Sequence, residues 1–296
     1  MYDVIIIGGG PAGITAGIYC QRANLKTIIF EKDAIGGQIA SSPLVENFPG
    51  CKSISGAQLA TNFLEQAEEL GVQIEIEEVL EIIPGKINKV KTDFGEYESK
   101  VVIIATGSKY RLLGLPREVD FIGKGIAFCT SCDGAFFKGK DIAVIGGGNS
   151  AVGNALYMAN LCNKVYLVDI CDHLICEKTL EEKLRKLPNV EIIQGTGVKE
   201  LLGEDELTGI KLTNDRVLDI QGMFISIGMV AQTDLVKDLV KLNPQKYIDS
   251  EDCTTEKAGI FVAGDCRSKN IRQLTTAVAD GTTAAINAIK YIENNK

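Results

Sequence analysis

Two cysteines at a spacing that suits redox chemistry stand near the middle of this 296-residue chain. They lie in Cys129-Thr130-Ser131-Cys132, which Asp133 follows at once. Two thiols at this spacing can close a disulfide within one turn, and such a pair beside a nucleotide-binding βα unit indicates thiol–disulfide exchange. The alternative is half of a zinc site, but zinc takes four ligands and the sequence holds no second Cys-x-x-Cys. We therefore expect a reversible dithiol and no metal.

A dithiol needs a source of electrons, and a glycine-rich turn near the N-terminus indicates a bound dinucleotide. The buried-strand run Tyr2–Ile7 leads into Gly8-Gly9-Gly10-Pro11-Ala12-Gly13, and an apolar helix is expected over residues 14–23. A second strand over residues 27–30 ends in Glu31, 23 positions after Gly8. Glycines let the backbone approach a pyrophosphate at a helix N-terminus, and the acid accepts hydrogen bonds from a ribose.

The same pattern returns 138 residues later, from Gly8 to Gly146. A strand is expected over residues 141–145, followed by the turn Gly146-Gly147-Gly148 and a helix over residues 152–161. The next strand, over residues 165–168, ends in Asp169. An internal repeat of this kind indicates two nucleotide-binding domains.

The last part of the chain has no counterpart between the two repeats. A strand there ends in Asp265, and Arg272-Gln273 leads into a long helix with small residues. We expect this part to complete the first domain. The predicted fold is therefore α/β, with two Rossmann-like domains of three layers (ββα). The first comprises residues 1–112 and 244–296, and the second, residues 113–243, is inserted in it.

Composition and charge narrow the class of protein. The chain is 45% hydrophobic and 24% charged, which is ordinary for a soluble globular protein. A net charge of −8 argues against nucleic acid as the main partner. No apolar run approaches the length of a membrane span, and the N-terminal region has no signal-peptide pattern. Nine cysteines without such a signal suggest a reducing compartment, so we expect a cytoplasmic protein.

A set of motifs along essentially the whole chain resembles the low-molecular-weight thioredoxin reductases. In chain order they are GGGPAG with Glu31, VENFPG, ATG, CTSCDG, GGGNSA, and GIFVAGD followed by RQLTTA. The resemblance implies FAD in the first domain, a homodimer, and thioredoxin as the protein substrate.

The resemblance also implies roles for individual residues. Cys132 would face the flavin, Cys129 would form the mixed disulfide with thioredoxin, and Asp133 would supply a proton to the departing thiolate. Contacts to FAD are expected, by motif position, from Gly8, Gly10, Pro11, Ala12, Gly13, Glu31, Gln38, Asn47, Thr106, Gly107, Asp265, Arg272 and Gln273.

Three departures from that family concern the second nucleotide site. Members that use NADPH carry a His-Arg-Arg-x-x-x-Arg run whose arginines hold the 2′-phosphate. Here the run is Asp169-Ile170-Cys171-Asp172-His173-Leu174-Ile175, where no arginine occurs and the Asp169 carboxylate would repel a phosphate. Gly153-Asn154 replaces the usual glutamate pair, and Met229-Val230-Ala231-Gln232 replaces the usual segment after the last strand. NADPH is therefore not expected as the donor.

Two electron donors stay open. The three losses resemble the ferredoxin-dependent flavin thioredoxin reductases, and we favour ferredoxin. NADH is the alternative, because Asp169 lies 23 residues after Gly146, where a ribose-binding acid belongs. A ferredoxin–NAD(P) reductase on the same fold would not need the Cys129/Cys132 pair. A flavin-bound thiol redox sensor is the non-enzymatic alternative.

A basic segment around the cysteines is the candidate surface for an acidic ferredoxin. It comprises Lys109, Arg111, Arg117, Lys124, Lys138 and Lys140, interspersed with Glu118, Asp120 and Asp133. The alternative is an ordinary solvated surface without a partner.

Overall fold

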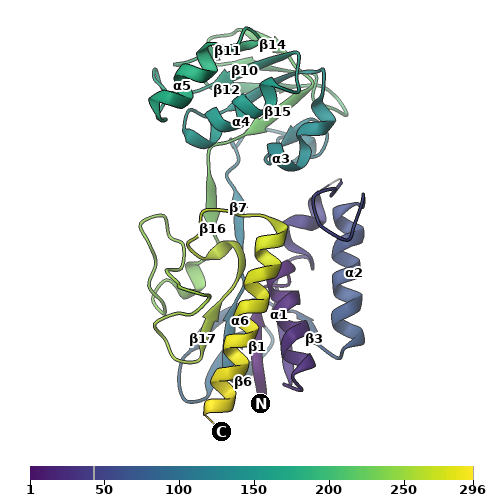
Figure 1. The fold of residues 1–296 in the computed structure, drawn as a ribbon, viewed down its shortest axis with the longest axis vertical. Coiled ribbons are helices and arrows are strands. Elements are labelled where there is room, and N and C mark those ends of the chain that lie inside the picture. The colour runs from purple at the N-terminus through teal and green to yellow at the C-terminus, as the bar shows by residue number, and fades with distance from the viewer. Residues whose placement is uncertain (43, 296) are drawn as a thin grey trace. The chain divides into compact units, whose positions relative to one another are not determined.

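The chain folds as two α/β units, the second inserted in the first (Figure 1). The computed structural model describes residues 1–42 and 44–295. The outer unit comprises Met1–Lys109 and Val230–Lys296, and the inserted unit is Tyr110–Met229. The chain passes between them in β7 (Ser108–Tyr110) and β16 (Met229–Ala231), which pair with each other.

A parallel sheet forms the middle layer of the outer unit. Its strands, in spatial order, are β3 (Gln73–Ile76), β2 (Thr27–Glu31), β1 (Tyr2–Ile7), β6 (Glu96–Ile104) and β17 (Ile260–Val262). The central strands are runs of β-branched residues with both faces covered, as parallel strands require. Their carboxyl ends consequently meet at one edge of the sheet.

Helices cover one face of this sheet and strands the other. Figure 1 shows α1 (Pro11–Arg22) and α6 (Leu274–Asn294) side by side, with α2 (Gly56–Glu69) next to α1. The two helices can approach closely because residue 281 is a glycine. A Cβ at this position would lie 2.3 Å from the Ala12 carbonyl oxygen. On the other face, residues of β4 (Val79–Ile83) and β5 (Asn88–Thr92) pack in the apolar core with Ile5 and Val102. β5 pairs antiparallel with the first half of β6, and β4 pairs antiparallel with β5.

The inserted unit repeats this plan. Its parallel sheet has the order β11 (Val190–Ile193), β10 (Lys164–Val168), β9 (Asp141–Ile145), β15 (Gly222–Ile225) and β8 (Ile126–Ala127). The helices are α3 (Thr130–Asp133), α4 (Asn149–Ala159) and α5 (Lys178–Arg185). A separate antiparallel sheet contains β12 (Val198–Leu202), β13 (Gly209–Leu212) and β14 (Val217–Asp219). Each face of the parallel sheet has its own apolar core, one with α4 and one with β12–β14.

This architecture confirms the predicted fold class of two Rossmann-like domains. The units divide at 109/110 and 229/230, whereas the divisions expected from the sequence are 112/113 and 243/244. Residues 230–243 fall in the outer unit, where Val236 and Val240 pack in the core beside Ile5 and Ile260. Among the described residues, no helix is both long and apolar enough to span a membrane.

Candidate functional site

The carboxyl ends of four neighbouring strands gather most of the predicted cofactor residues at one edge of the outer unit. Glu31 ends β2, and the first glycine turn follows β1. Thr106-Gly107 follows β6, and Asp265 follows β17. Because β2, β1, β6 and β17 are parallel neighbours, these four groups lie along a single edge. Ligands of open α/β sheets bind at such an edge.

The first glycine turn is shaped by close backbone contacts. Gly8 has φ +112°, and a Cβ there would lie 2.3 Å from the Ala105 carbonyl oxygen. A Cβ on Gly13 would lie 1.9 Å from the Gly8 oxygen, so neither glycine can be replaced without moving backbone. Gly10, by contrast, has open space around its Cα, and Pro11-Ala12 begins α1. The open side of the turn is thus free to receive a pyrophosphate.

Glu31 is held against this turn. Its Oε2 accepts a 2.7 Å hydrogen bond from Gly9 N, and its Oε1 accepts one of 2.9 Å from Asp33 N. Each carboxylate oxygen keeps a second lone pair, so ribose hydroxyls can still be bound.

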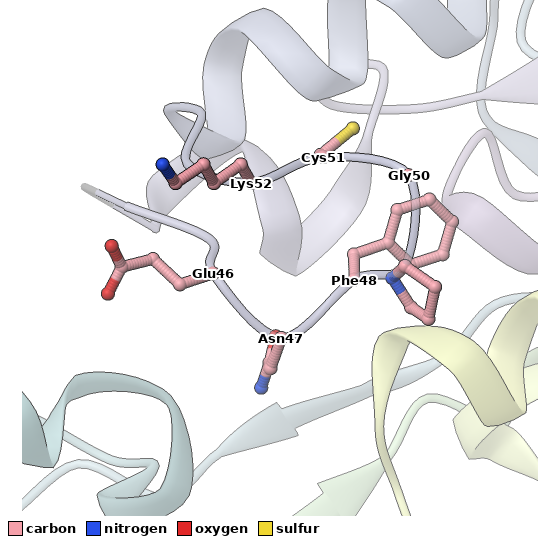
Figure 2. A pocket seen from close by; sticks show the side chains of 7 residues that line it. Glu46, Asn47, Phe48, Gly50, Cys51 and Lys52 are labelled. Atoms are coloured by element: carbon pink, nitrogen blue, oxygen red, sulfur yellow. The ribbon is translucent and has the colours of Figure 1, made fainter.

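Gln38 and Asn47 lie outside the strand ends, Gln38 in a 3-10 helix over Gly37–Ser41 and Asn47 in a loop. Gln38 Nε2 donates a 2.6 Å hydrogen bond to the Ser108 carbonyl, which places its side chain beside the Thr106-Gly107 turn. Gly107 has φ +69° and open space around its Cα. Asn47 lines a hollow of about 510 Å³ formed by residues 46–52, and Figure 2 shows its side chain at the bend of that loop.

Asp265 belongs to a partly buried cluster of charges that the sequence did not reveal. Its pKa is raised, chiefly because it is buried, while Lys269 Nζ, 3.1 Å from Oδ1, opposes the shift. The same ammonium lies 2.9 Å from Asp280 Oδ2, and Arg267 NH1 lies 3.0 Å from Asp280 Oδ1. Lys269 thus holds two carboxylates together. No periodicity or motif connects positions 265, 269 and 280, so only the tertiary fold identifies this cluster.

Arg272 and Gln273 follow this cluster. The Arg272 guanidinium lies 3.9 Å from the centre of the Tyr247 ring, and its Nε is 3.5 Å from the Asp265 carbonyl. Gln273 is the N-cap of α6, where its side chain and that of Thr276 cap each other's backbone N–H groups. The structure therefore gives Gln273 a capping role that its motif position did not predict.

The outer-unit edge fits a flavin dinucleotide. It offers open backbone at Gly10 and Gly107, a helix N-terminus at Pro11 and an acid beside the turn at Glu31. These are the features that a pyrophosphate and a ribose need.

The cysteine pair lies at the corresponding edge of the inserted unit. Cys129 and Cys132 form a disulfide with an S–S distance of 2.06 Å and Cα atoms 5.2 Å apart. Cys129 follows β8 and precedes the short helix α3, and both cysteines are partly exposed. Among the described residues, no group of three or more acidic, histidine or cysteine side chains could hold a metal ion.

Asp133 carries an unsatisfied carboxyl oxygen beside this disulfide. Its Oδ1 is buried and accepts no hydrogen bond within the described part of the chain. Burial raises the pKa of this carboxyl from 3.8 to about 6. A carboxylic acid that titrates near neutrality can give a proton to a thiolate.

The second glycine turn retains much of the geometry of the first. Gly146 has φ +126°, and Gly148 has open space around its Cα. The buried Asp169 lies against the turn, since a Cβ on Gly147 would lie 1.8 Å from Asp169 Oδ2. The acid thus lies beside the second turn much as Glu31 lies beside the first.

The segment after Asp169 is acidic at its surface. No lysine or arginine occurs from 169 to 177. Asp172 is almost fully exposed, and its Oδ1 lies 2.6 Å from His173 Nδ1. This hydrogen bond lowers the pKa of Asp172 and raises that of His173. His173 is therefore already engaged, and a 2′-phosphate would meet a charged carboxylate here.

The predicted basic surface divides into engaged and available cations. Lys109 pairs with Asp33 at 3.3 Å, and Arg117 donates to the carbonyls of Gly203 and Glu204. The Lys140 ammonium lies 5.4 Å from the centre of the Phe137 ring. The three remaining cations are exposed and have no carboxylate within 4 Å in the described part of the chain: Arg111, Lys124 and Lys138.

One acid in this segment does not oppose the cations. Glu118 is buried, and its carboxylate accepts hydrogen bonds from Leu113 N (2.7 Å), Gly114 N (2.7 Å) and Leu115 N (3.1 Å). The surface of the segment is consequently more positive than its sequence suggests.

A dinucleotide edge in one unit and a cysteine pair that closes a disulfide in the other are the marks of a nucleotide-dependent disulfide oxidoreductase. Comparison with known proteins agrees, since residues 2–281 match the pyridine nucleotide-disulphide oxidoreductase family. The chain belongs to this family.

Its relatives share nearly its whole length. The "34.2 kDa protein in rubredoxin operon" of Clostridium pasteurianum is 43% identical, over 98% of this chain and 97% of the relative. The thioredoxin reductase of Bacillus subtilis is 39% identical, over 99% of this chain and 95% of the relative. The crystal structure of thioredoxin reductase from Streptococcus pyogenes is 39% identical, with a TM-score of 0.94 and 99% of each chain covered. Thioredoxin reductases of this family are FAD-binding flavoproteins, and FAD is the cofactor of this chain.

Proposed function

We propose that this chain is a flavin-dependent thioredoxin reductase that takes electrons from reduced ferredoxin. The observation that carries the choice of donor is the segment from 169 to 177, where a charged Asp172 stands and no lysine or arginine is present to bind a 2′-phosphate. A carboxylate beside a phosphate opposes NADPH by charge repulsion. The homodimer and the cytoplasmic location belong to this proposal and stay predictions.

The dithiol exchanges electrons with thioredoxin in two steps. The Cys129 thiolate attacks the substrate disulfide, so that a Cys129–substrate bond forms, the substrate S–S bond breaks, and one substrate sulfur leaves as a thiolate. Cys132 then attacks Cys129, which restores the 129–132 disulfide and releases the second substrate sulfur. Asp133, with its pKa near 6, is the proposed donor for a departing thiolate. Thioredoxin gains two electrons and two protons.

Reduction of the 129–132 disulfide returns the enzyme to its starting state. Bound FAD would supply the link to a one-electron donor, because a flavin accepts electrons singly and delivers them as a pair. Two reduced ferredoxins are oxidised for each thioredoxin disulfide. In the outer unit, Glu31 and the Gly10 backbone would hold the ribose and pyrophosphate of the cofactor.

The exposed cations support an acidic protein donor. Arg111, Lys124 and Lys138 have no acidic partner within 4 Å in the described residues, and Glu118 is turned inward. Unpaired surface cations accelerate encounter with an anionic partner.

NADH is the second candidate donor, favoured by the placement of Asp169. Its carboxylate lies against Gly147, and the open side of the turn at Gly148 is free, as in the outer unit. NADH has a 2′-hydroxyl that an acid can bind in place of the 2′-phosphate. It would donate a hydride, and so both electrons at once.

An anaerobic assay with purified thioredoxin separates these donors. The enzyme is supplied in parallel with reduced ferredoxin, NADH and NADPH, and new thioredoxin thiols are counted. Reduced rubredoxin makes a useful fourth arm, because a 43% identical relative is named for a rubredoxin operon. We expect turnover with ferredoxin and little with either nucleotide. Faster turnover with NADH would overturn the choice of donor, and no turnover with any donor would overturn the reductase assignment.

A further inference from the structure

A chain of side-chain hydrogen bonds ties the cysteine pair to α4. The Thr130 hydroxyl donates a 2.7 Å hydrogen bond to Asn154 Oδ1. Asn154 Nδ2 in turn donates a 2.8 Å hydrogen bond to Ser226 Oγ. Thr130 is one of the two residues between the cysteines, and it is only 6% exposed. The Asn154 amide therefore forms hydrogen bonds through both its oxygen and its nitrogen, and the oxygen binds the segment between the cysteines.

The topology explains why these three residues meet. Thr130 follows β8, Ser226 follows β15, and β15 lies between β8 and β9 in the parallel sheet. Ser226 is fixed in turn, because its N–H donates to the Ile145 carbonyl at 2.8 Å. The α4 helix starts from the second glycine turn and passes close to α3, so its second turn presents Asn154 to both strand ends.

The helix that carries the cysteines is too short to be stable by itself. The α3 helix has only four residues, and no side chain caps its N-terminus. Cys129 Sγ lies 3.4 Å from Ser131 Oγ, a contact within the segment itself. A helix this short has almost no stability of its own and depends on tertiary contacts. The hydrogen bond from Thr130 to Asn154 anchors α3 to another element, the helix α4.

We propose that Asn154 is a positioning residue for thiol–disulfide exchange: it fixes Thr130, and through it the spacing of the Cys129 and Cys132 sulfurs. The inference rests on the proposed disulfide-exchange function and deepens it. Gly153-Asn154 stands where the resembling reductases carry a glutamate pair, and Asn154 gives this departure a role at the dithiol.

The chemical consequence concerns how readily the intramolecular disulfide closes. When Cys129 carries a mixed disulfide, Cys132 must attack the Cys129 sulfur and release the substrate thiolate. The rate and equilibrium of this ring closure depend on how closely the two sulfurs are held, because pre-organisation replaces lost conformational entropy. A loosened α3 should make the disulfide easier to reduce and slow its closure.

The test measures the equilibrium between disulfide and dithiol in the FAD-loaded enzyme, without ferredoxin or thioredoxin. Anaerobic glutathione buffers set the potential, acid and alkylation stop exchange, and mass spectrometry of the peptide with Cys129 and Cys132 gives the oxidised fraction. Thr130→Val removes the hydroxyl and keeps the shape, and we expect the oxidation equilibrium constant to fall about fivefold to tenfold. A tenfold fall is about 30 mV for a two-electron couple. Asn154→Leu should produce a similar fall.

Two controls make the result specific. Thr130→Ser restores the hydroxyl and should stay within about twofold of the parent. Thr196→Val removes another buried hydroxyl of the same unit, one that pairs with Thr213, and should also stay within about twofold. In turnover with thioredoxin, Thr130→Val should lower kcat and leave KM unchanged, because a buried hydroxyl does not contact the partner.

The proposal is overturned if Thr130→Val stays within twofold of the parent, or if Thr196→Val shifts the equilibrium as far. Should Asn154→Leu fail to fold, the comparison of Val and Ser at position 130 decides alone. Because the equilibrium uses neither protein partner, a failure of the ferredoxin assignment would leave this result intact.

Discussion

Glu31 Oε2 accepts a 2.7 Å hydrogen bond from Gly9 N, so the acid at the end of β2 is fastened to the glycine turn after β1. In the inserted unit, Asp169 lies against Gly147 in the same relation of strand end and turn. The internal repeat therefore preserves two acid–glycine pairs, and only the surroundings distinguish them. The second pair is followed by the acidic surface segment that contains Asp172.

Replacing the first acid should weaken cofactor binding. Glu31→Ala removes the acceptor for Gly9 N and for a ribose, and we expect the dissociation constant of FAD to rise at least tenfold, since hydrogen bonds to charged groups contribute about 1.5–3 kcal/mol. Flavin fluorescence during reconstitution of the apoprotein measures it. Asp169→Ala is the matched control in the other unit and should retain its FAD. Equal loss from both variants would contradict the assignment of FAD to the outer unit.

The two cysteines should differ in function. Cys129→Ser should abolish thioredoxin reduction while the purified protein keeps its flavin, because the interchange thiol is lost and the outer unit is intact. Cys132→Ser should trap a mixed disulfide through Cys129, visible by mass spectrometry as an enzyme–thioredoxin adduct. Cys171→Ser, at a free cysteine of the same unit, serves as control. Thioredoxin reduction by Cys129→Ser would rule out the proposed exchange.

Asp133 should impose a pH dependence on turnover. Its pKa of about 6 means that the acid form, the proposed proton donor, is lost as pH rises through that value. Asp133→Asn cannot donate such a proton, and kcat should fall about tenfold to hundredfold with the pH dependence near 6 removed. Turnover from pH 5 to pH 8 for parent and variant provides the check. An unchanged profile in the variant would exclude Asp133 as the donor.

The same carboxyl should also affect stability, and the sign follows from its raised pKa. The folded state binds a proton at about pH 6 and the unfolded state near 3.8, so stability from this group is lost as pH rises from 3.8 through 6. The difference in unfolding free energy between Asp133→Asn and the parent should therefore favour the variant more at pH 7.5 than at pH 5. Urea unfolding at both pH values measures the two differences. A larger gain at pH 5 would show that the carboxyl is not destabilised by burial.

Lys269 should hold the charge cluster of the outer unit together. Lys269→Met leaves the partly buried Asp265 without its cation, while Asp280 keeps Arg267, and we expect a loss of about 2–3 kcal/mol in the free energy of unfolding. Lys290→Met, at an exposed position on α6, should change stability by less than about 0.5 kcal/mol. Denaturant unfolding measures the change in unfolding free energy for both variants. A loss at Lys269 no larger than at Lys290 would show that the cluster contributes nothing to the fold.

Charge reversal tests the proposed donor surface. The triple variant Arg111→Glu, Lys124→Glu and Lys138→Glu should lower kcat/KM for ferredoxin about tenfold or more at low salt, because like charges slow encounter. The three substitutions are also made singly, and each single variant is compared with Lys186→Glu. This control reverses one charge at the end of α5 and so has the same net charge. Parent turnover should fall as salt rises from 50 to 300 mM, since the Debye length shortens. A flat salt response would exclude electrostatic steering.

Local patterns in the sequence were enough to predict the fold and the cysteine pair that forms a disulfide. Strand, glycine turn, helix and terminal acid stand within one short segment in each repeat, so Glu31 and Asp169 could be placed beside their turns without a structure. The Cys129/Cys132 pair was equally visible, because its spacing alone defines its chemistry.

The contacts that support those residues could not be predicted in this way. Asn154 meets Thr130 across 24 positions and Ser226 across 72, and no periodicity connects them. Lys269 and Asp280 meet only because β17 and α6 return to the outer unit. Two of the six cations predicted for the basic surface, Lys109 and Arg117, have partners that are distant in the sequence, so their engagement could not be predicted from local patterns. Hydrogen bonds and ion pairs of this kind depend on tertiary structure.

The most direct measurement of the central claim is the rate at which the bound flavin loses its absorbance near 450 nm under anaerobic conditions. One enzyme preparation is mixed with reduced ferredoxin, NADH or NADPH in a stopped-flow instrument. We expect ferredoxin to bleach the flavin within the turnover time and both nucleotides to act far more slowly. Rapid bleaching by either nucleotide, with ferredoxin inactive, would contradict the proposed route of electrons.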